Sequence, residues 1–166
     1  MVTQAASRSK RQTLYKSYKK LFILTIGGGI VFWATTIATS LLPLAAEYRA
    51  AYSNWSIQTV WVDSLFVGMV FGGCVSYSLL RFFDKLPTKN PILKSALLSS
   101  IALVIVTILI DVPRSFPGPD HSLYYFLIGA IFNLVRFLLL GVTIGYLYKR
   151  LYAPPHFAHM FKGDEK

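Results

Sequence analysis

Four long apolar blocks, separated by short polar segments, organise this 166-residue chain. The first block, residues 21–44, is uncharged, and a helix of its roughly 24 residues spans about 36 Å. This length exceeds the roughly 30 Å of a bilayer's hydrocarbon core. The other blocks are residues 57–83, 91–112 and 123–151. We therefore predict an all-α membrane protein, a bundle of four transmembrane helices in a single domain.

Prolines mark the ends of these blocks. Pro91 suits the first turn of a helix, where its missing N–H is not needed. Proline elsewhere removes a backbone donor and interrupts a helix. The remaining prolines near the blocks therefore indicate where helices end: Pro43, Pro113, Pro117 and Pro119.

Lys and Arg are distributed unevenly among the polar segments. Residues 1–20 contain six, residues 81–94 contain four and residues 149–166 contain four, whereas residues 45–56 and 113–122 contain one each. Cytoplasmic connections of membrane proteins carry the excess of these residues. We therefore predict a multi-pass protein of the cell or plasma membrane with both termini cytoplasmic, an N-in/C-in arrangement.

This orientation divides the chain into three parts. Residues 1–20 form a basic cytoplasmic N-terminal tail, residues 21–151 the transmembrane domain and residues 152–166 a cytoplasmic C-terminal tail. The N-terminal tail either lies as a short helix on anionic headgroups or is a disordered tail that only sets the topology. Both interpretations of this tail stay open.

The composition agrees with a chain that needs a non-aqueous solvent. Hydrophobic residues make up 54% and charged residues 14%, compared with roughly 45–50% and 25% in soluble domains. The net charge of +10 lies at the ends of the apolar blocks and does not form a basic face interleaved with aromatics. We expect the lipid bilayer and its anionic headgroups as partners at the cytoplasmic face, and no nucleic acid.

No metal or cofactor is expected. A single cysteine, Cys74, excludes an intrachain disulfide and a thiolate zinc site. Haem ligation inside a bundle needs histidines within helices, but His121, His156 and His159 lie outside the blocks. The triplet at residues 27–29 lacks the GxGxxG spacing and flanking strand of a dinucleotide site.

Ionisable residues inside the blocks are the candidate functional residues. Arg136 lies near the middle of the fourth block, where an unpaired guanidinium costs at least about 2.5–3.5 kcal/mol. Asp63 and Asp111 are the candidate partners. We prefer Asp63, which lies about 9 Å below the outer end of its helix, with Asn133 one turn above Arg136 as a helper.

Two interpretations of this intramembrane polar site remain. Asp63 and Arg136 form a buried structural ion pair that fixes the register of the helices, which is the favoured reading. Alternatively, they form a site that exchanges a proton or receives a charged substrate.

Small residues supply a second face on two of the helices. Gly68 and Gly72 in the second block, and Gly141 and Gly145 in the fourth, have the small-xxx-small spacing that lets helix backbones approach closely. We favour packing within the chain. A homo-oligomer or a larger membrane complex stays open.

A formal glycosylation sequon occurs at Asn54, in the predicted outer segment 45–56. It lies close to the membrane, which argues against its use. Chance occurrence is the favoured explanation.

The sequence thus predicts a small non-enzymatic accessory, scaffold or assembly subunit. The alternative is a small oligomeric transporter or channel-like protein for a proton, cation or small solute that uses Asp63 and Arg136. A membrane enzyme has no supporting cluster of acids at the cytoplasmic interface. The surroundings of Arg136 discriminate between them: dry and paired for the scaffold, wet and reachable from one side for the transporter.

Overall fold

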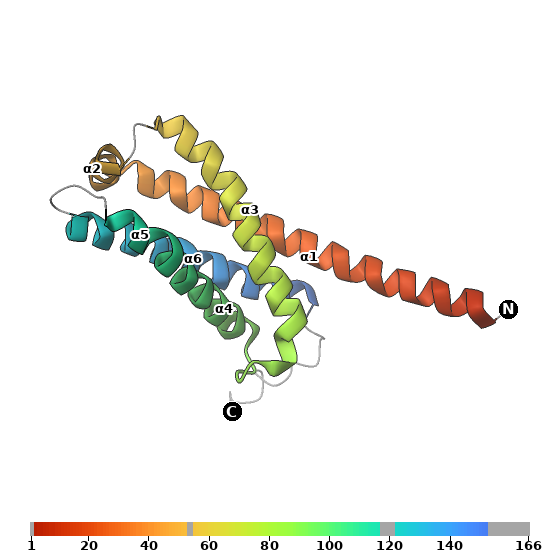
Figure 1. The fold of residues 1–166 in the computed structure, drawn as a ribbon. Helices are drawn as coiled ribbons and strands as arrows, with labels where there is room; N and C mark the ends of the chain where they lie inside the picture. Colours follow the sequence, from red (N-terminus) through yellow and green to blue (C-terminus); the bar gives the residue numbers. More distant parts are fainter. Residues whose placement is uncertain (1, 53–54, 117–121, 153–166) are drawn as a thin grey trace, which may run out of the picture.

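The computed structural model describes residues 2–52, 55–116 and 122–152, which contain helices and no strand (Figure 1). Four helices are long and apolar enough to cross a membrane, so the prediction of an all-helical protein with four spans is confirmed. The elements in chain order are α1 (Val2–Ser40), α2 (Pro43–Tyr52), α3 (Ile57–Phe82), the 3₁₀-helix η1 (Phe83–Lys85), α4 (Pro91–Val106), the π-helix η2 (Thr107–Asp111), α5 (Val112–Ser115) and α6 (Ser122–Tyr152).

Helix α1 includes the basic segment that precedes the first span. It runs without a break over 39 residues, and its N-terminal part projects beyond the other helices in Figure 1. Residues 1–20 contain neither Gly nor Pro and include the strong helix formers Ala, Gln, Lys, Arg and Leu. The segment is therefore a continuation of the spanning helix, a form that neither sequence-based interpretation described.

The first span ends at Ser40, before the predicted end at Leu44. Pro43 has no N–H to continue the helix and disfavours the helical conformation in the residue before it. The chain turns at Leu41 and Leu42, where the Leu42 N–H donates to the Thr39 carbonyl (3.2 Å).

A short helix, α2, occupies most of the segment that we expected to be an outer connection. Its residues include several good helix formers, and Pro43 fits the first helical position. Buried Ala45 packs with Ile128 and Phe132, which anchors α2 on α6. The described end of the bundle that carries α2 and α5 is called the α2 end below, and the end with η1 is called the η1 end.

The third span, Pro91–Asp111, ends within one residue of its predicted end, but the chain stays helical beyond it as α5. Pro113 lies within the helical stretch, and a proline there clashes with the carbonyl four residues earlier. The backbone widens into a π-turn before it, so that the Val112 N–H donates to the Thr107 carbonyl. The chain then continues as α5, and Asp111 ends the π-turn.

Glycines set the closest helix contacts. Helix α3 crosses α1 with Gly68 and Gly72 against it: a Cβ added to Gly72 would lie 2.8 Å from the Thr25 carbonyl oxygen and 3.1 Å from the Gly29 nitrogen. Helix α6 meets α4 in the same way, since a Cβ on Gly145 would lie 2.5 Å from the Ile92 Cα. Gly141 lies against Ala96 and Ser99 of α4. Both glycine pairs thus lie at contacts within the chain.

An aromatic and aliphatic core fills the centre of the bundle. The Phe137 ring meets Phe32 and Phe71 edge-on, at centroid distances of 5.7 and 4.9 Å. Farther along α6 toward the η1 end, Leu140 and Ile144 have no exposed surface. Side chains therefore fill the interior of the bundle between Phe137 and the η1 end.

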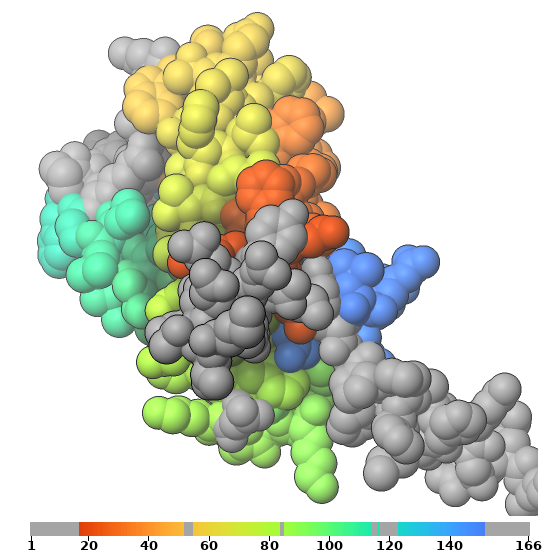
Figure 2. All heavy atoms as spheres, turned by 90° about the vertical axis from the view of Figure 1, so that its right-hand side faces the viewer, coloured from red at the N-terminus to blue at the C-terminus, as the bar shows by residue number. Residues whose placement is uncertain are grey.

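A buried lysine stabilises the η1 end. Lys94 is 5% exposed, its Nζ donates to the Phe83 carbonyl, and it lies 3.8 Å from the centroid of the Phe83 ring. The Phe83 ring in turn stacks on Tyr148 at 4.9 Å. Figure 2 shows the connection between α3 and α4 and the end of α6 gathered on this side of the molecule. Lys94, which in the sequence bears only on the orientation, therefore also caps the end of α3.

Adjacent glycines on α3 give a test of the α1–α3 contact. Gly72→Ala should lower the free energy of unfolding by about 1–3 kcal/mol, because the new methyl group meets the α1 backbone. Gly73→Ala is the control, since its Cβ would lie 3.7 Å from the Thr25 side chain, an ordinary contact. Unfolding in mixed detergent micelles measures both, and equal stability of the two variants would contradict this packing.

Candidate functional site

A cavity of about 470 Å³ opens at the α2 end of the bundle. Five elements contribute to its wall, namely α1, α2, α3, η2 and α6, together with Trp55, two residues before α3. The side chains that line it are Ser40, Ala45, Tyr48, Arg49, Trp55, Val60, Asp63, Asp111, Gly129, Phe132, Asn133 and Arg136. All four predicted polar site residues, Asp63, Asp111, Asn133 and Arg136, therefore line one cavity.

Arg136 lies on the α6 wall of this cavity. Its Nη2 donates to Thr39 Oγ1 at 3.2 Å, and its Nη1 donates to Asn133 Oδ1 at 3.4 Å. The Nε atom is buried and has no hydrogen-bond partner among the residues that the structure describes. The guanidinium is thus held by two neutral oxygens, one from α1 and one from its own helix.

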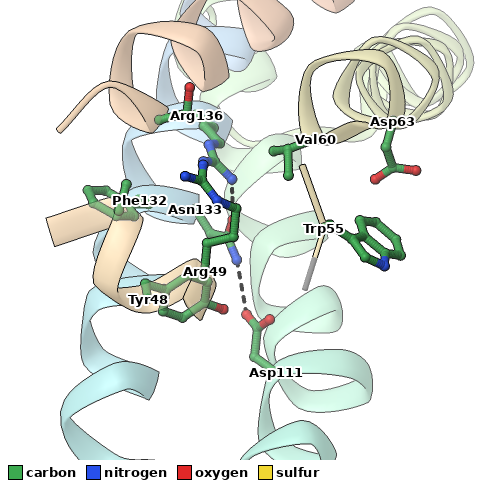
Figure 3. Close-up of a pocket in the computed structure, with 12 residues that line it drawn as sticks. Tyr48, Arg49, Trp55, Val60, Asp63, Asp111, Phe132, Asn133 and Arg136 are labelled. Carbon is green, nitrogen blue, oxygen red and sulfur yellow. Dashed lines mark hydrogen bonds between the residues drawn. The ribbon is translucent and has the colours of Figure 1, made fainter. Parts of the chain in front are cut away.

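Asn133 connects Arg136 to a carboxylate. It lies one turn before Arg136 on the same face of α6, a spacing at which helix side chains meet. Its Nδ2 donates to Asp111 Oδ2 at 3.1 Å (Figure 3). Because Asp111 ends the π-turn, the widened backbone is what brings the third span into this network; such π-turns are frequent at functional sites.

Asp63 does not pair with Arg136, and our preference for it as the direct partner is corrected. Its side chain is exposed, and among the described residues it makes no hydrogen bond with Arg136. Figure 3 shows Asp63 on the other side of the cavity, beyond Val60. Helix α3 packs chiefly against α1 through its buried face. Asp63 lies on another face of α3, so it is distant from Arg136 even though its depth along the helix is suitable.

The second guanidinium of the cavity, Arg49, was not predicted as a site residue. It enters from α2, next to Tyr48, whose ring lies against Gly129 of α6. Both residues lie in the segment 45–56 that the sequence predicts to be an outer connection, where Arg49 bears only on the orientation. Pro43 followed by helix-forming residues was the signal that could have revealed the helix carrying them.

Tryptophans tie α1 to α3 beside the cavity. Trp61 Nε1 donates to Ser40 Oγ at 2.9 Å, and Trp33 Nε1 donates to the Trp61 carbonyl at 2.9 Å. Both indoles place their ring in the apolar layer and their N–H on a partner, as buried Trp usually does. These bonds fix the separation of the two helices that form one side of the cavity.

No group of three or more His, Cys, Asp or Glu that could hold a metal occurs in residues 2–52, 55–116 and 122–152. His121, His156, His159 and the sequon residue Asn54 lie outside the described residues. Cys74 is exposed on α3.

No protein-family model, curated protein or solved structure matches this chain. The four apolar helices are those of an integral membrane protein.

Replacing the bridging amide tests the network. Asn133→Leu removes the bonds to Asp111 and Arg136 and should lower the free energy of unfolding by about 1–2 kcal/mol, since hydrogen bonds between membrane helices contribute up to about 1.7 kcal/mol each. Gln58→Leu is the matched control, because its amide is exposed at the same end of the bundle. A loss no larger for Asn133→Leu than for Gln58→Leu would count against the network.

Proposed function

We propose that this protein is a small non-enzymatic accessory or assembly subunit of the cell membrane, with both termini cytoplasmic and a cavity open only to the outside. Arg136 is reachable from the α2 end, which by the criterion above also suits a transporter. The observation that carries the proposal is therefore the filled core between Arg136 and the η1 end, where Phe137, Leu140 and Ile144 are buried in the described bundle.

The network around Arg136 supports a fixed scaffold. It joins α1 through Thr39, α6 through Asn133 and the third span through Asp111. Hydrogen bonds that join different transmembrane helices favour one relative arrangement of those helices. Three of the four spans are thus tied at one level.

The filled core argues against a path across a single chain. Phe32, Phe71 and Phe137 meet at the centre, and Leu140 and Ile144 have no exposed surface. A solute that reached Arg136 from the α2 end would meet this apolar layer. The cavity therefore suits binding at one face.

The charge distribution supports the orientation. The exposed cations of the described residues lie mainly at the η1 end, including Lys19, Arg81, Lys85, Lys89 and Lys149. Lys and Arg near an anionic leaflet contribute about 1 kcal/mol each. With the η1 end cytoplasmic, these residues meet the anionic headgroups and the cavity opens on the opposite side.

A transporter is the second candidate, because Asp63 and Arg136 both line the cavity. Transport would require several copies or a rearrangement that opens the phenylalanine core. In that case a reagent added on the cytoplasmic side would reach the cavity in some state of the protein.

Labelling of single cysteines with a membrane-impermeant thiol reagent tests both candidates, in a Cys74→Ser background. Val60→Cys, on the cavity wall, should react only from outside; Lys89→Cys, in the connection before α4, only from inside; and Val67→Cys, packed on the core, from neither side.

Each result has a distinct meaning. An unreactive Val60→Cys would contradict the open cavity, and a Lys89→Cys that reacts from outside would contradict the orientation. Reaction of Val60→Cys from inside would replace the accessory function with transport.

A further inference from the structure

We propose that the cavity binds a zwitterionic group, with an oxyanion at Arg49 and Arg136 and an ammonium at Asp63 and Trp55. The oxyanion is a phosphate or a carboxylate. This inference rests on the proposed function in one respect, namely that the cavity is open to the outside.

The oxyanion end is set by two guanidiniums from different helices. Within the described part of the chain, Arg136 is hydrogen-bonded only to neutral oxygens, at 3.2 and 3.4 Å, and its Nε is buried without a hydrogen-bond partner. Asp111, the nearest carboxylate in its network, is engaged by the Asn133 amide. A guanidinium binds phosphate and carboxylate through parallel N–H donors, so Arg136 retains the capacity for such a group. Arg49 enters the same cavity from α2.

The ammonium end is set by the opposite wall. Asp63 is exposed, and its carboxylate has no hydrogen bond with any described residue. Trp55 lies near it in Figure 3, across the cavity from Arg49 and Arg136. A carboxylate and an indole that line the same cavity suit an ammonium, because the ring face attracts cations and the carboxylate accepts their hydrogen bonds.

The balance of charges selects a ligand with both signs. Two arginines and two aspartates line the cavity. A purely anionic ligand would be repelled by the aspartates, and a purely cationic ligand would be repelled by the arginines. For either ligand, repulsion at one wall would offset the binding free energy gained at the other. A zwitterion is matched at both walls. A volume of about 470 Å³ suits a small ligand or a headgroup.

The same chemistry has two sources. The headgroup of phosphatidylethanolamine in the outer leaflet carries a phosphate and a primary ammonium, and so does soluble phosphoethanolamine. The experiment separates them by presenting each alone to the full-length protein in a non-ionic detergent.

Binding is measured by calorimetry with short-chain phosphatidylethanolamine, phosphatidylglycerol of the same chain length, and soluble phosphoethanolamine. Phosphatidylethanolamine should bind at least about tenfold more tightly than phosphatidylglycerol, since one charge-assisted contact contributes about 1.5–3 kcal/mol. Asp63→Asn should remove this preference, and Arg49→Gln should weaken binding of both lipids. Binding of the soluble zwitterion as well identifies a soluble ligand, and binding of the lipid alone identifies the headgroup; either supports the proposal.

Matched controls keep the test specific. Asp63 is exposed and without a described hydrogen bond, so Asp63→Asn should fold as the parent does. Glu47→Gln removes an exposed carboxylate of α2 that does not line the cavity, and it should leave binding unchanged.

Equal affinity for the two lipids, absence of binding by either zwitterion, or an equal effect of Glu47→Gln and Asp63→Asn would overturn the proposal. Labelling of Val60→Cys in the same preparation separates the two failures. A reactive Val60→Cys without zwitterion binding rejects this inference alone, whereas an unreactive one rejects the open cavity.

Discussion

The burial of one guanidinium in the bilayer constrains the α2 end of this protein. Arg136 lies in the middle of an apolar helix, where an unsatisfied charge costs at least about 2.5–3.5 kcal/mol. Arg136 donates hydrogen bonds to Thr39, near the end of α1, and to Asn133, one turn earlier on α6. The end of α1 must therefore lie beside this part of α6. Asn133 in turn reaches the third span only because the π-turn presents Asp111 to it. The arrangement of three spans at this level thus follows from one side chain.

The two ends of the bundle are built differently. Toward the η1 end, glycines allow backbone contact between α1 and α3 and between α4 and α6, and phenylalanine and aliphatic side chains fill the core. Toward the α2 end, polar and aromatic side chains replace this packing, and a cavity remains between them. The short helix α2 covers α6 there and supplies Tyr48 and Arg49. The filled half at the η1 end and the open polar half at the α2 end are the physical basis of our proposal that binding occurs at one face.

The four spans could be predicted from the sequence, but the contacts of individual side chains between helices could not. Hydrophobic length predicts where a helix crosses the bilayer, and the spacing of Gly68 and Gly72 indicates a face that packs closely. The depth of a residue along its helix also follows from the sequence, and this depth is what favours Asp63 as a partner for Arg136. Which helix lies beside which depends on contacts distant in sequence, and these place Asp63 on the opposite wall. The helix α2 and the π-turn at Asp111 arise from local effects of Pro43 and Pro113 whose outcome depends on packing against α6.

The most direct test is a pair of double-mutant cycles on the free energy of unfolding in detergent. One combines Arg136→Gln with Asp111→Asn, and the other combines Arg136→Gln with Asp63→Asn. The structure predicts a coupling clearly above about 0.5 kcal/mol for Arg136 and Asp111, and additivity within about 0.3–0.5 kcal/mol for Arg136 and Asp63. Coupling between Arg136 and Asp63 with additivity for Asp111 would contradict the account and restore the direct ion pair.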